Sequence, residues 1–259
     1  MGRILSRQKP FIPVAEPLLD GKELEYVTDC LKSGWISSLG KYVHDFEQGF
    51  ADYCGVRYGV ATSNGTVAIH LLAATLNLGP GDEVIMPSLT YVATANGIKY
   101  TGATPVLVDS ERQTWNIDPE RVVEAITPKT KAIFAVHLYG YPADMDSLRA
   151  IADEYNLLLL EDAAEAHGAC YKGQRVGALS DAAIFSFYGN KIITTGEGGI
   201  IVTNHKEWAE RAFHLLPPQH LLIDIKYGRG DRRNINLTAS GKRYKEIVEE
   251  IKKRYGEAP

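Results

Sequence analysis

The chain has 259 residues, of which 45% are hydrophobic and 23% are charged, so it is long enough for one large globular domain. Its formal net charge of −4 gives no basic excess for nucleic acid or an anionic membrane surface. No apolar run approaches the roughly 18 residues that cross a bilayer, and the N-terminus does not resemble a signal peptide. Three scattered cysteines, Cys30, Cys54 and Cys170, suit neither a disulfide framework nor a metal site. We therefore expect reduced thiols, no metal and a cytoplasmic protein.

Strand-like and helix-like segments alternate along most of the chain. Asp20 is the expected N-cap of a first helix, which carries Leu24, Val27 and Leu31 on one face and ends at Gly34. The alternation predicts βαβ units and hence an α/β fold with a mainly parallel sheet. Further helices are expected at 42–54, after residue 66, and at 91–100, 144–155 and 207–215, with strands at 57–61, 83–86, 104–108, 131–136, 157–161, 182–187 and 199–203.

The pattern changes after residue 216. Two prolines, Pro217 and Pro218, end the last of these helices. Residues 221–227 are a candidate strand, and residues 242–255 form a candidate amphipathic helix supported by charge pairs four residues apart. We therefore divide the chain into a large domain at residues 1–216 and a short C-terminal tail at residues 217–259.

Gly65 and Thr66 lie where an expected strand turns into an expected helix. The free N–H groups and partial positive charge of a helix N-terminus suit a phosphate, and Gly65 lets a ligand approach the backbone closely. An ordinary helix cap explains the same residues, so both interpretations stay open.

Asp162 and Glu165 follow another apolar strand. In open α/β sheets, ligands bind beyond the carboxyl ends of the strands, so an acid at this place can face a ligand. A helix cap at Asp162 and a solvated Glu165 are the alternative interpretation.

Lys191 follows the expected strand that includes Ser186, and a glycine-rich stretch at residues 196–199 comes soon after it. Most lysines are surface residues. In a dry site, however, a lysine can lose its proton, form a Schiff base with a carbonyl, and later move protons as a general acid–base.

Together these segments resemble the DegT/DnrJ/EryC1/StrS family of sugar aminotransferases, which depend on pyridoxal 5'-phosphate (PLP). The resemblance runs from about residue 13 to about residue 216, and its motifs are long and specific to the family. They are residues 34–38 (GWISS), 80–85 (PGDEVI), 87–96 (PSLTYVATAN), 114–118 (TWNID), 136–140 (VHLYG), 142–146 (PADMD), 161–167 (EDAAEAH) and 185–199.

The resemblance implies the large domain of aspartate-aminotransferase-like (fold type I) enzymes, with PLP as cofactor. Lys191 matches the catalytic lysine that binds PLP covalently. Asp162 matches the partner of the pyridine nitrogen, which makes the ring an electron sink, and Glu165 the polar residue near the ring hydroxyl. Gly65, Thr66 and Ser186 match positions that bind the cofactor phosphate, and Tyr91 matches the residue that stacks on the ring face. Asn190 lies beside cofactor or substrate, and Trp35 and Ser37 border the sugar-nucleotide site, with simple packing as the alternative for Trp35. His137 and His167 lie in family motifs and are interpreted as structural residues.

Lys191 also bears on the reaction, because relatives that dehydrate deoxysugars carry histidine at this position. The lysine favours transamination, and a PLP-dependent dehydratase is the alternative within the family. The resemblance implies L-glutamate as amino donor, a nucleotide-linked 4-keto-6-deoxyhexose as acceptor, and a homodimer. Residues 34–38 and 63–66 are most similar to perosamine synthases, which use a GDP-linked sugar.

The family pattern is lost after residue 216, where members continue into a smaller C-terminal domain. A natural truncation, a shifted or spliced reading frame and an engineered tail are open explanations. Since the missing region closes the active site in the family, we expect weakened activity. A non-catalytic truncated or engineered scaffold that retains the PLP-site motifs is therefore the alternative from another class. A PLP-dependent regulatory protein is disfavoured by the lack of a basic stretch.

Overall fold

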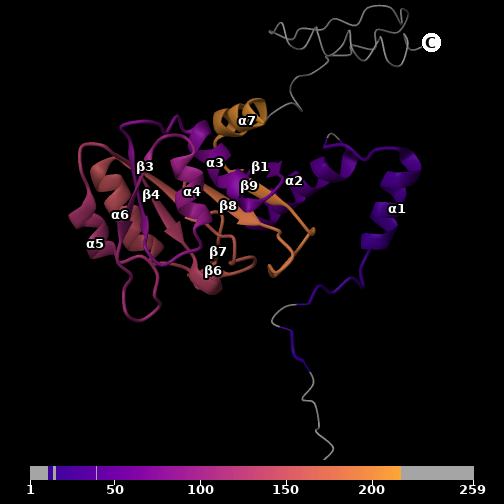
Figure 1. Cartoon of the computed structure of the whole chain (residues 1–259), viewed down its shortest axis with the longest axis horizontal. Coiled ribbons are helices and arrows are strands. Elements are labelled where there is room, and N and C mark those ends of the chain that lie inside the picture. Colours follow the sequence, from indigo (N-terminus) through magenta and orange to yellow (C-terminus); the bar gives the residue numbers. More distant parts are fainter. Residues whose placement is uncertain (1–10, 14–15, 39, 217–259) are drawn as a thin grey trace, which may run out of the picture.

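The computed structural model describes residues 11–13, 16–38 and 40–216; Figure 1 shows the whole chain. Seven strands form one sheet in the order β1-β9-β8-β5-β4-β2-β3. Every strand of this sheet runs in the same direction except β9, which is antiparallel to β1 and β8. The strands are β1 (Tyr58–Thr62), β2 (Glu83–Pro87), β3 (Thr104–Val108), β4 (Thr130–Val136), β5 (Leu158–Asp162), β8 (Ala182–Ser186) and β9 (Gly199–Thr203).

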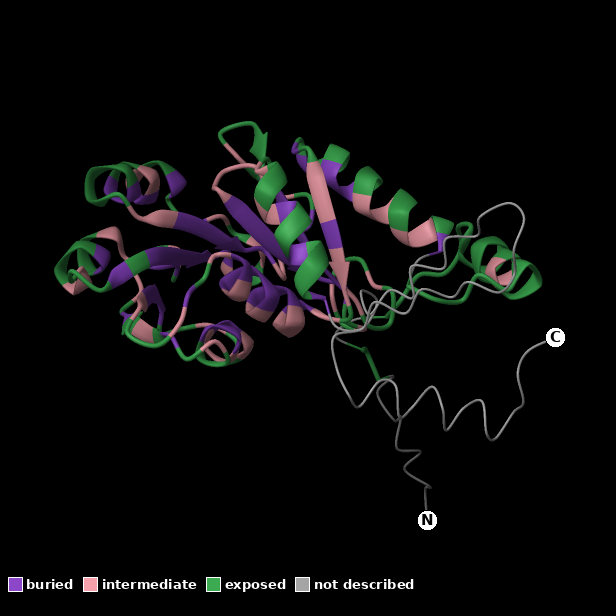
Figure 2. Cartoon of the chain, turned by 90° about the horizontal axis from the view of Figure 1, so that it is seen from above, coloured by how far each residue is buried: buried purple, intermediate pink, exposed green. Residues whose placement is uncertain are grey.

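Helices cover both faces of the sheet, which explains why its central strands are apolar at nearly every position. On one face, Ile69 of α3, Ile98 of α4 and Ala212 of α7 belong to one core cluster with residues of the sheet. On the other face, α2, α5 and α6 bury residues such as Phe50 and Leu148. Figure 2 shows the strands largely buried. The helices are α1 (Glu23–Ser33), α2 (Lys41–Cys54), α3 (Gly65–Thr75), α4 (Ala93–Lys99), α5 (Pro119–Ala125), α6 (Met145–Tyr155) and α7 (Lys206–Leu215).

The predicted fold class, an α/β domain with a mainly parallel mixed sheet flanked by helices, is confirmed. One boundary is wrong: α1 begins at Glu23 rather than after Asp20, and Lys22 occupies the N-cap position. The Glu23 side chain accepts a hydrogen bond from the Gly21 N–H at 2.9 Å, which fixes the turn before the helix. Gly34 does end α1, in the left-handed conformation.

Some elements were not predicted. Helix α5 is capped by Asp118, whose side chain accepts a hydrogen bond from Glu120 N–H, and it begins with Pro119. A hairpin of two very short strands, β6 (Cys170–Tyr171) and β7 (Gln174–Arg175), and the 3-10 turn η1 (Leu138–Gly140) follow later.

Helix α1 lies beyond α2 in Figure 1, away from the sheet, and none of its residues is buried. The expected strand at residues 221–227, the expected helix at residues 242–255 and the whole tail at 217–259 lie outside the described residues.

Candidate active site

A cavity of about 780 Å³ opens at the edge of the sheet where the parallel strands end. The residues that line it come directly after β1 and β2, or close β4, β5 and β8. This is the edge at which an open α/β sheet binds its ligands. Of the predicted site residues, the cavity brings together Gly65, Thr66, Tyr91, Asp162, Glu165, Ser186, Asn190 and Lys191.

The N-terminus of α3 forms one end of the cavity and packs against the end of β8. A Cβ atom on Gly65 would lie 2.8 Å from Cβ of Ser186, so only glycine allows this approach. Gly199 is paired with Ser186 and supports the same turn, because its own Cβ would lie 2.5 Å from the Asn64 carbonyl carbon. Asn64 caps the helix by accepting a hydrogen bond from Val67 N–H at 3.0 Å. The structure thus shows both a capped helix and a helix N-terminus that opens into a cavity.

Asp162 closes β5 at the middle of the cavity, and its side chain is held on both sides. Its Oδ2 accepts a hydrogen bond from the Thr94 hydroxyl at 2.7 Å, and its Oδ1 accepts one from Ala164 N–H at 3.2 Å. Burial is the main influence on this carboxyl and raises its pKa, whereas Thr94, Ala164 and the positive charge of Lys191 lower it. A buried carboxylate of this kind gains from a cationic hydrogen-bond donor in the cavity.

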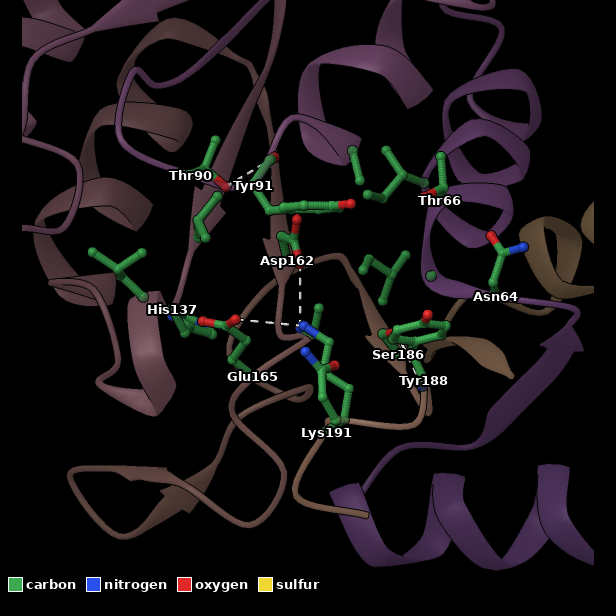
Figure 3. Close-up of a pocket in the computed structure, with 18 of the residues that line it drawn as sticks. Asn64, Thr66, Thr90, Tyr91, His137, Asp162, Glu165, Ser186, Tyr188 and Lys191 are labelled. Carbon is green, nitrogen blue, oxygen red and sulfur yellow. Dashed lines mark hydrogen bonds and ion pairs between the residues drawn. The ribbon is translucent and has the colours of Figure 1, made fainter. Parts of the chain in front are cut away.

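Lys191 enters the cavity from the loop after β8 (Figure 3). Its Nζ lies 3.4 Å from Oε1 of Glu165, and only 16% of its side chain is exposed. The second oxygen of Glu165 accepts a hydrogen bond from the Tyr139 N–H at 3.0 Å. Glu165 therefore links the lysine amine to the turn that follows β4.

His137 also lines the cavity, but its ring is fully engaged in a structural network. Its Nδ1 accepts a hydrogen bond from Ala143 N–H at 3.1 Å, so Nε2 carries the proton that faces Glu161 Oε2 at 3.0 Å. Glu161 is buried and also accepts hydrogen bonds from Gly177 N–H, Leu179 N–H and the Ser180 hydroxyl. This network fixes the ends of β4 and β5, from which Asp162 projects.

The other predicted site residues differ in position. Tyr91 and Asn190 line the cavity mouth with exposed side chains. Trp35 and Ser37 are exposed in the segment after α1 and are not among the residues that line the cavity. Thr94 and Tyr139 also belong to the site but were not predicted from the sequence; both lie within family motifs, which are the signal that could have identified them.

The arrangement fits PLP. An open helix N-terminus with a glycine cradle suits its phosphate, the buried Asp162 suits a protonated ring nitrogen, and Lys191 suits an aldehyde carbon. The described residues contain no cluster of three side chains suited to a metal ion.

The fold and this site define the large domain of an aspartate-aminotransferase-like enzyme. A family model matches residues 17–219, and the chain belongs to the DegT/DnrJ/EryC1/StrS aminotransferase family. It is 55% identical over 202 residues to the GDP-perosamine synthase of Caulobacter vibrioides, which covers 78% of this chain and 54% of that protein. The chain spans about half the length of the curated relatives that it matches.

Solved structures are also similar. DesI, determined in the presence of its TDP-sugar product, has a TM-score of 0.71 and 42% identity, covering 74% of this chain and 48% of that one. The PLP form of the putative sugar aminotransferase Spr1654 from Streptococcus pneumoniae has a TM-score of 0.76 and 33% identity, covering 79% of this chain and 57% of that one. No helix within the described ranges is long and apolar enough to cross a membrane.

Proposed function

We propose that this chain binds PLP at Lys191 and belongs to an enzyme that transfers an amino group from L-glutamate to a nucleotide-linked 4-keto-6-deoxyhexose. The observation that carries the proposal is that Lys191, Asp162 and the α3 N-terminus, which are far apart in sequence, line one cavity. Similarity to GDP-perosamine synthases supports a GDP-linked acceptor. Lysine rather than histidine at position 191 supports transamination over dehydration.

Each cavity residue has a distinct role in this proposal. The N–H groups of Gly65 and Thr66 and the Ser186 hydroxyl bind the cofactor phosphate. The Asp162 carboxylate holds the proton on the pyridine nitrogen, and Thr94 keeps the carboxylate oriented. Tyr91 covers the ring face, Glu165 lies toward the ring hydroxyl, and Asn190 contacts cofactor or substrate.

Lys191 has two tasks. With PLP bound, its Nζ would condense with the cofactor aldehyde and release water. The amine that the substrate later frees would then move a proton between the substrate carbon and the cofactor. When bound, PLP supplies the electron sink that makes this proton acidic. Glu165 orients the Lys191 amine through the 3.4 Å ion pair.

Beyond the cavity, we propose that residues 1–216 form the large domain, that the active protein is a homodimer, and that Trp35 and Ser37 contact the nucleotide sugar from the segment after α1. All three cysteines are free thiols in the structure, which supports a cytoplasmic location.

The test begins with the purified chain and PLP, followed by borohydride reduction and peptide mass mapping. The expected result is a PLP adduct on Lys191, lost in Lys191→Ala, with no comparable adduct on the exposed Lys172. Addition of L-glutamate should then bleach the visible cofactor band of the unreduced sample. A folded chain without an adduct on Lys191 would replace this proposal with the non-catalytic scaffold.

A further inference from the structure

Tyr139 has an unusual backbone for a bulky residue. Its φ of 50° and ψ of 29° lie in the left-handed region, which residues other than glycine, asparagine and aspartate rarely adopt. Its side chain gains nothing from burial in return, because it is 87% exposed at the mouth of the cavity. Strained residues of this kind persist where the surrounding structure holds them and where function uses them.

The turn that carries Tyr139 is held from two sides. Glu165 Oε2 accepts the Tyr139 N–H at 3.0 Å. Asn116 is buried; its Oδ1 accepts the Leu138 N–H at 3.1 Å, and its Nδ2 donates to the Tyr141 carbonyl at 3.0 Å. These hydrogen bonds therefore hold the backbone of Tyr139 in place, although its phenol ring is largely exposed.

The position of this backbone relative to Lys191 is also fixed. One oxygen of Glu165 contacts Tyr139 N, and the other lies 3.4 Å from Lys191 Nζ. A single carboxylate thus separates the Tyr139 backbone from the amine of the proposed reaction. A ring anchored here can reach the sugar ring that reacts at the cavity, whereas the nucleobase is separated from that sugar by a diphosphate.

We propose that Tyr139 is a substrate-binding residue whose aromatic face packs against the hexose of the nucleotide sugar, with Asn116 and Glu165 as the residues that position it. This inference rests on the proposed function and names one contact within it. An aromatic ring offers a large apolar face at low cost in conformational entropy, which suits the C–H face of a sugar.

The test compares hexose binding in four forms of the PLP-loaded chain: the unchanged protein, Tyr139→Ala, Tyr139→Phe and Tyr141→Ala. Tyr141 is the matched control, because it is 60% exposed on the same turn and does not line the cavity. GDP-mannose is the probe, followed by saturation-transfer NMR and by titration. We expect strong transfer to the hexose protons and a Kd that rises about fivefold in Tyr139→Ala alone, with Tyr139→Phe close to the unchanged protein.

The borohydride-trapped adduct on Lys191 is measured in every form, which separates the two proposals. Its absence from the unchanged protein overturns the proposed function and this inference together. An intact adduct with equal GDP-mannose affinity in Tyr139→Ala overturns the inference alone, as does an intact adduct without GDP-mannose binding. If Tyr139→Ala does not fold, Tyr139→Asn replaces it, since asparagine tolerates the left-handed backbone. If Tyr139→Ala changes the oligomeric state in sedimentation experiments but not the affinity for GDP-mannose, Tyr139 belongs to an interface between chains and the inference is overturned.

Discussion

The Thr94 hydroxyl lies 2.7 Å from Oδ2 of Asp162, joining the start of α4 to the end of β5 across 68 residues of sequence. Both side chains are buried. Burial raises the pKa of the Asp162 carboxyl, and the Thr94 hydrogen bond lowers it. Thr94 therefore favours the charged form of the carboxylate that is proposed to pair with the pyridine nitrogen of the cofactor.

Replacement of Thr94 by valine tests this relationship. Thr94→Val keeps the shape of the side chain and removes the hydroxyl, so a buried carboxylate loses a donor and the pKa of Asp162 should rise further. We expect the free energy of unfolding to fall by about 1.5–3 kcal/mol in urea titrations at neutral pH, together with weaker PLP binding.

A second threonine provides the control. Thr75 is also buried, but its hydroxyl has no hydrogen-bond partner among the described residues. Thr75→Val should therefore leave stability unchanged or raise it by about 1 kcal/mol. Equal losses in the two variants would show that the Thr94 hydroxyl contributes no specific hydrogen bond.

Asp162→Asn should make the cofactor-free protein more stable at neutral pH while it weakens PLP binding. Burial raises the folded-state pKa of Asp162 above the value of about 3.9 in the unfolded chain. The charged carboxylate therefore costs stability above the folded pKa, and this cost disappears as the pH falls below about 3.9. The stability advantage of Asp162→Asn over the unchanged protein should therefore shrink as the pH falls.

Cofactor binding by Asp162→Asn is measured by PLP titration. Loss of a charge-assisted hydrogen bond should weaken it about 10- to 100-fold. An advantage in stability that stays constant down to low pH would contradict the burial argument, and an unchanged PLP affinity would contradict the pairing with the ring nitrogen.

The strands and most helices could be predicted from local pattern, because each is a run of apolar residues with its own period and caps. Elements with weak periodic signals were missed: β6 and β7 have two residues each. Helix α5 has seven residues, although Asp118 and Pro119 form a recognisable start. The start of α1 was misplaced because a local hydrogen bond from Gly21 to Glu23, rather than an N-cap at Asp20, sets it.

Residues at or just after strand ends, such as Asp162 at the end of β5 and Lys191 in the loop after β8, could be predicted from sequence because strand ends meet at one edge of the sheet. The contacts between them could not. The pairing of Thr94 with Asp162 depends on how α4 packs against α3, and no local signal marks the left-handed backbone of Tyr139. The resemblance to a family identified the motifs that contain Thr94 and Tyr139, whereas the contacts of these two residues could be assigned only from the structure.

Gly199→Ala should destabilise the protein by about 1–3 kcal/mol through overpacking. The added methyl group would lie 2.5 Å from backbone atoms of Asn64, which cannot move without displacing the start of α3. Because that helix start is the proposed phosphate site, PLP affinity should fall as well. Gly49→Ala is the control: Gly49 lies in α2, a Cβ there meets nothing within 4 Å, and the helix should gain about 0.5–1 kcal/mol. Urea titration of both variants measures the change in stability, and PLP titration measures the change in affinity. An unchanged stability in Gly199→Ala would contradict the close packing of Gly199 against the Asn64 backbone.

His167 should make the protein sensitive to acid. It is buried against the rings of Phe50, Phe185 and Phe187, and a backbone interaction with Ser186 raises its pKa by less than burial lowers it. Burial lowers its pKa to about 4, whereas the unfolded histidine titrates near 6.5. Between these values the unfolded chain binds more protons, so stability is complete above about pH 6.5 and is lost as the pH falls toward 4, by on the order of 3 kcal/mol.

His167→Phe should remove this contribution, since phenylalanine suits the aromatic surroundings and cannot be protonated. Urea titrations from pH 7 to about pH 4 should show a shallower loss of stability in the variant than in the unchanged protein. Parallel curves for His167→Phe and the unchanged protein would show that the ring is protonated without unfolding, and that water reaches the aromatic cluster beneath the cavity.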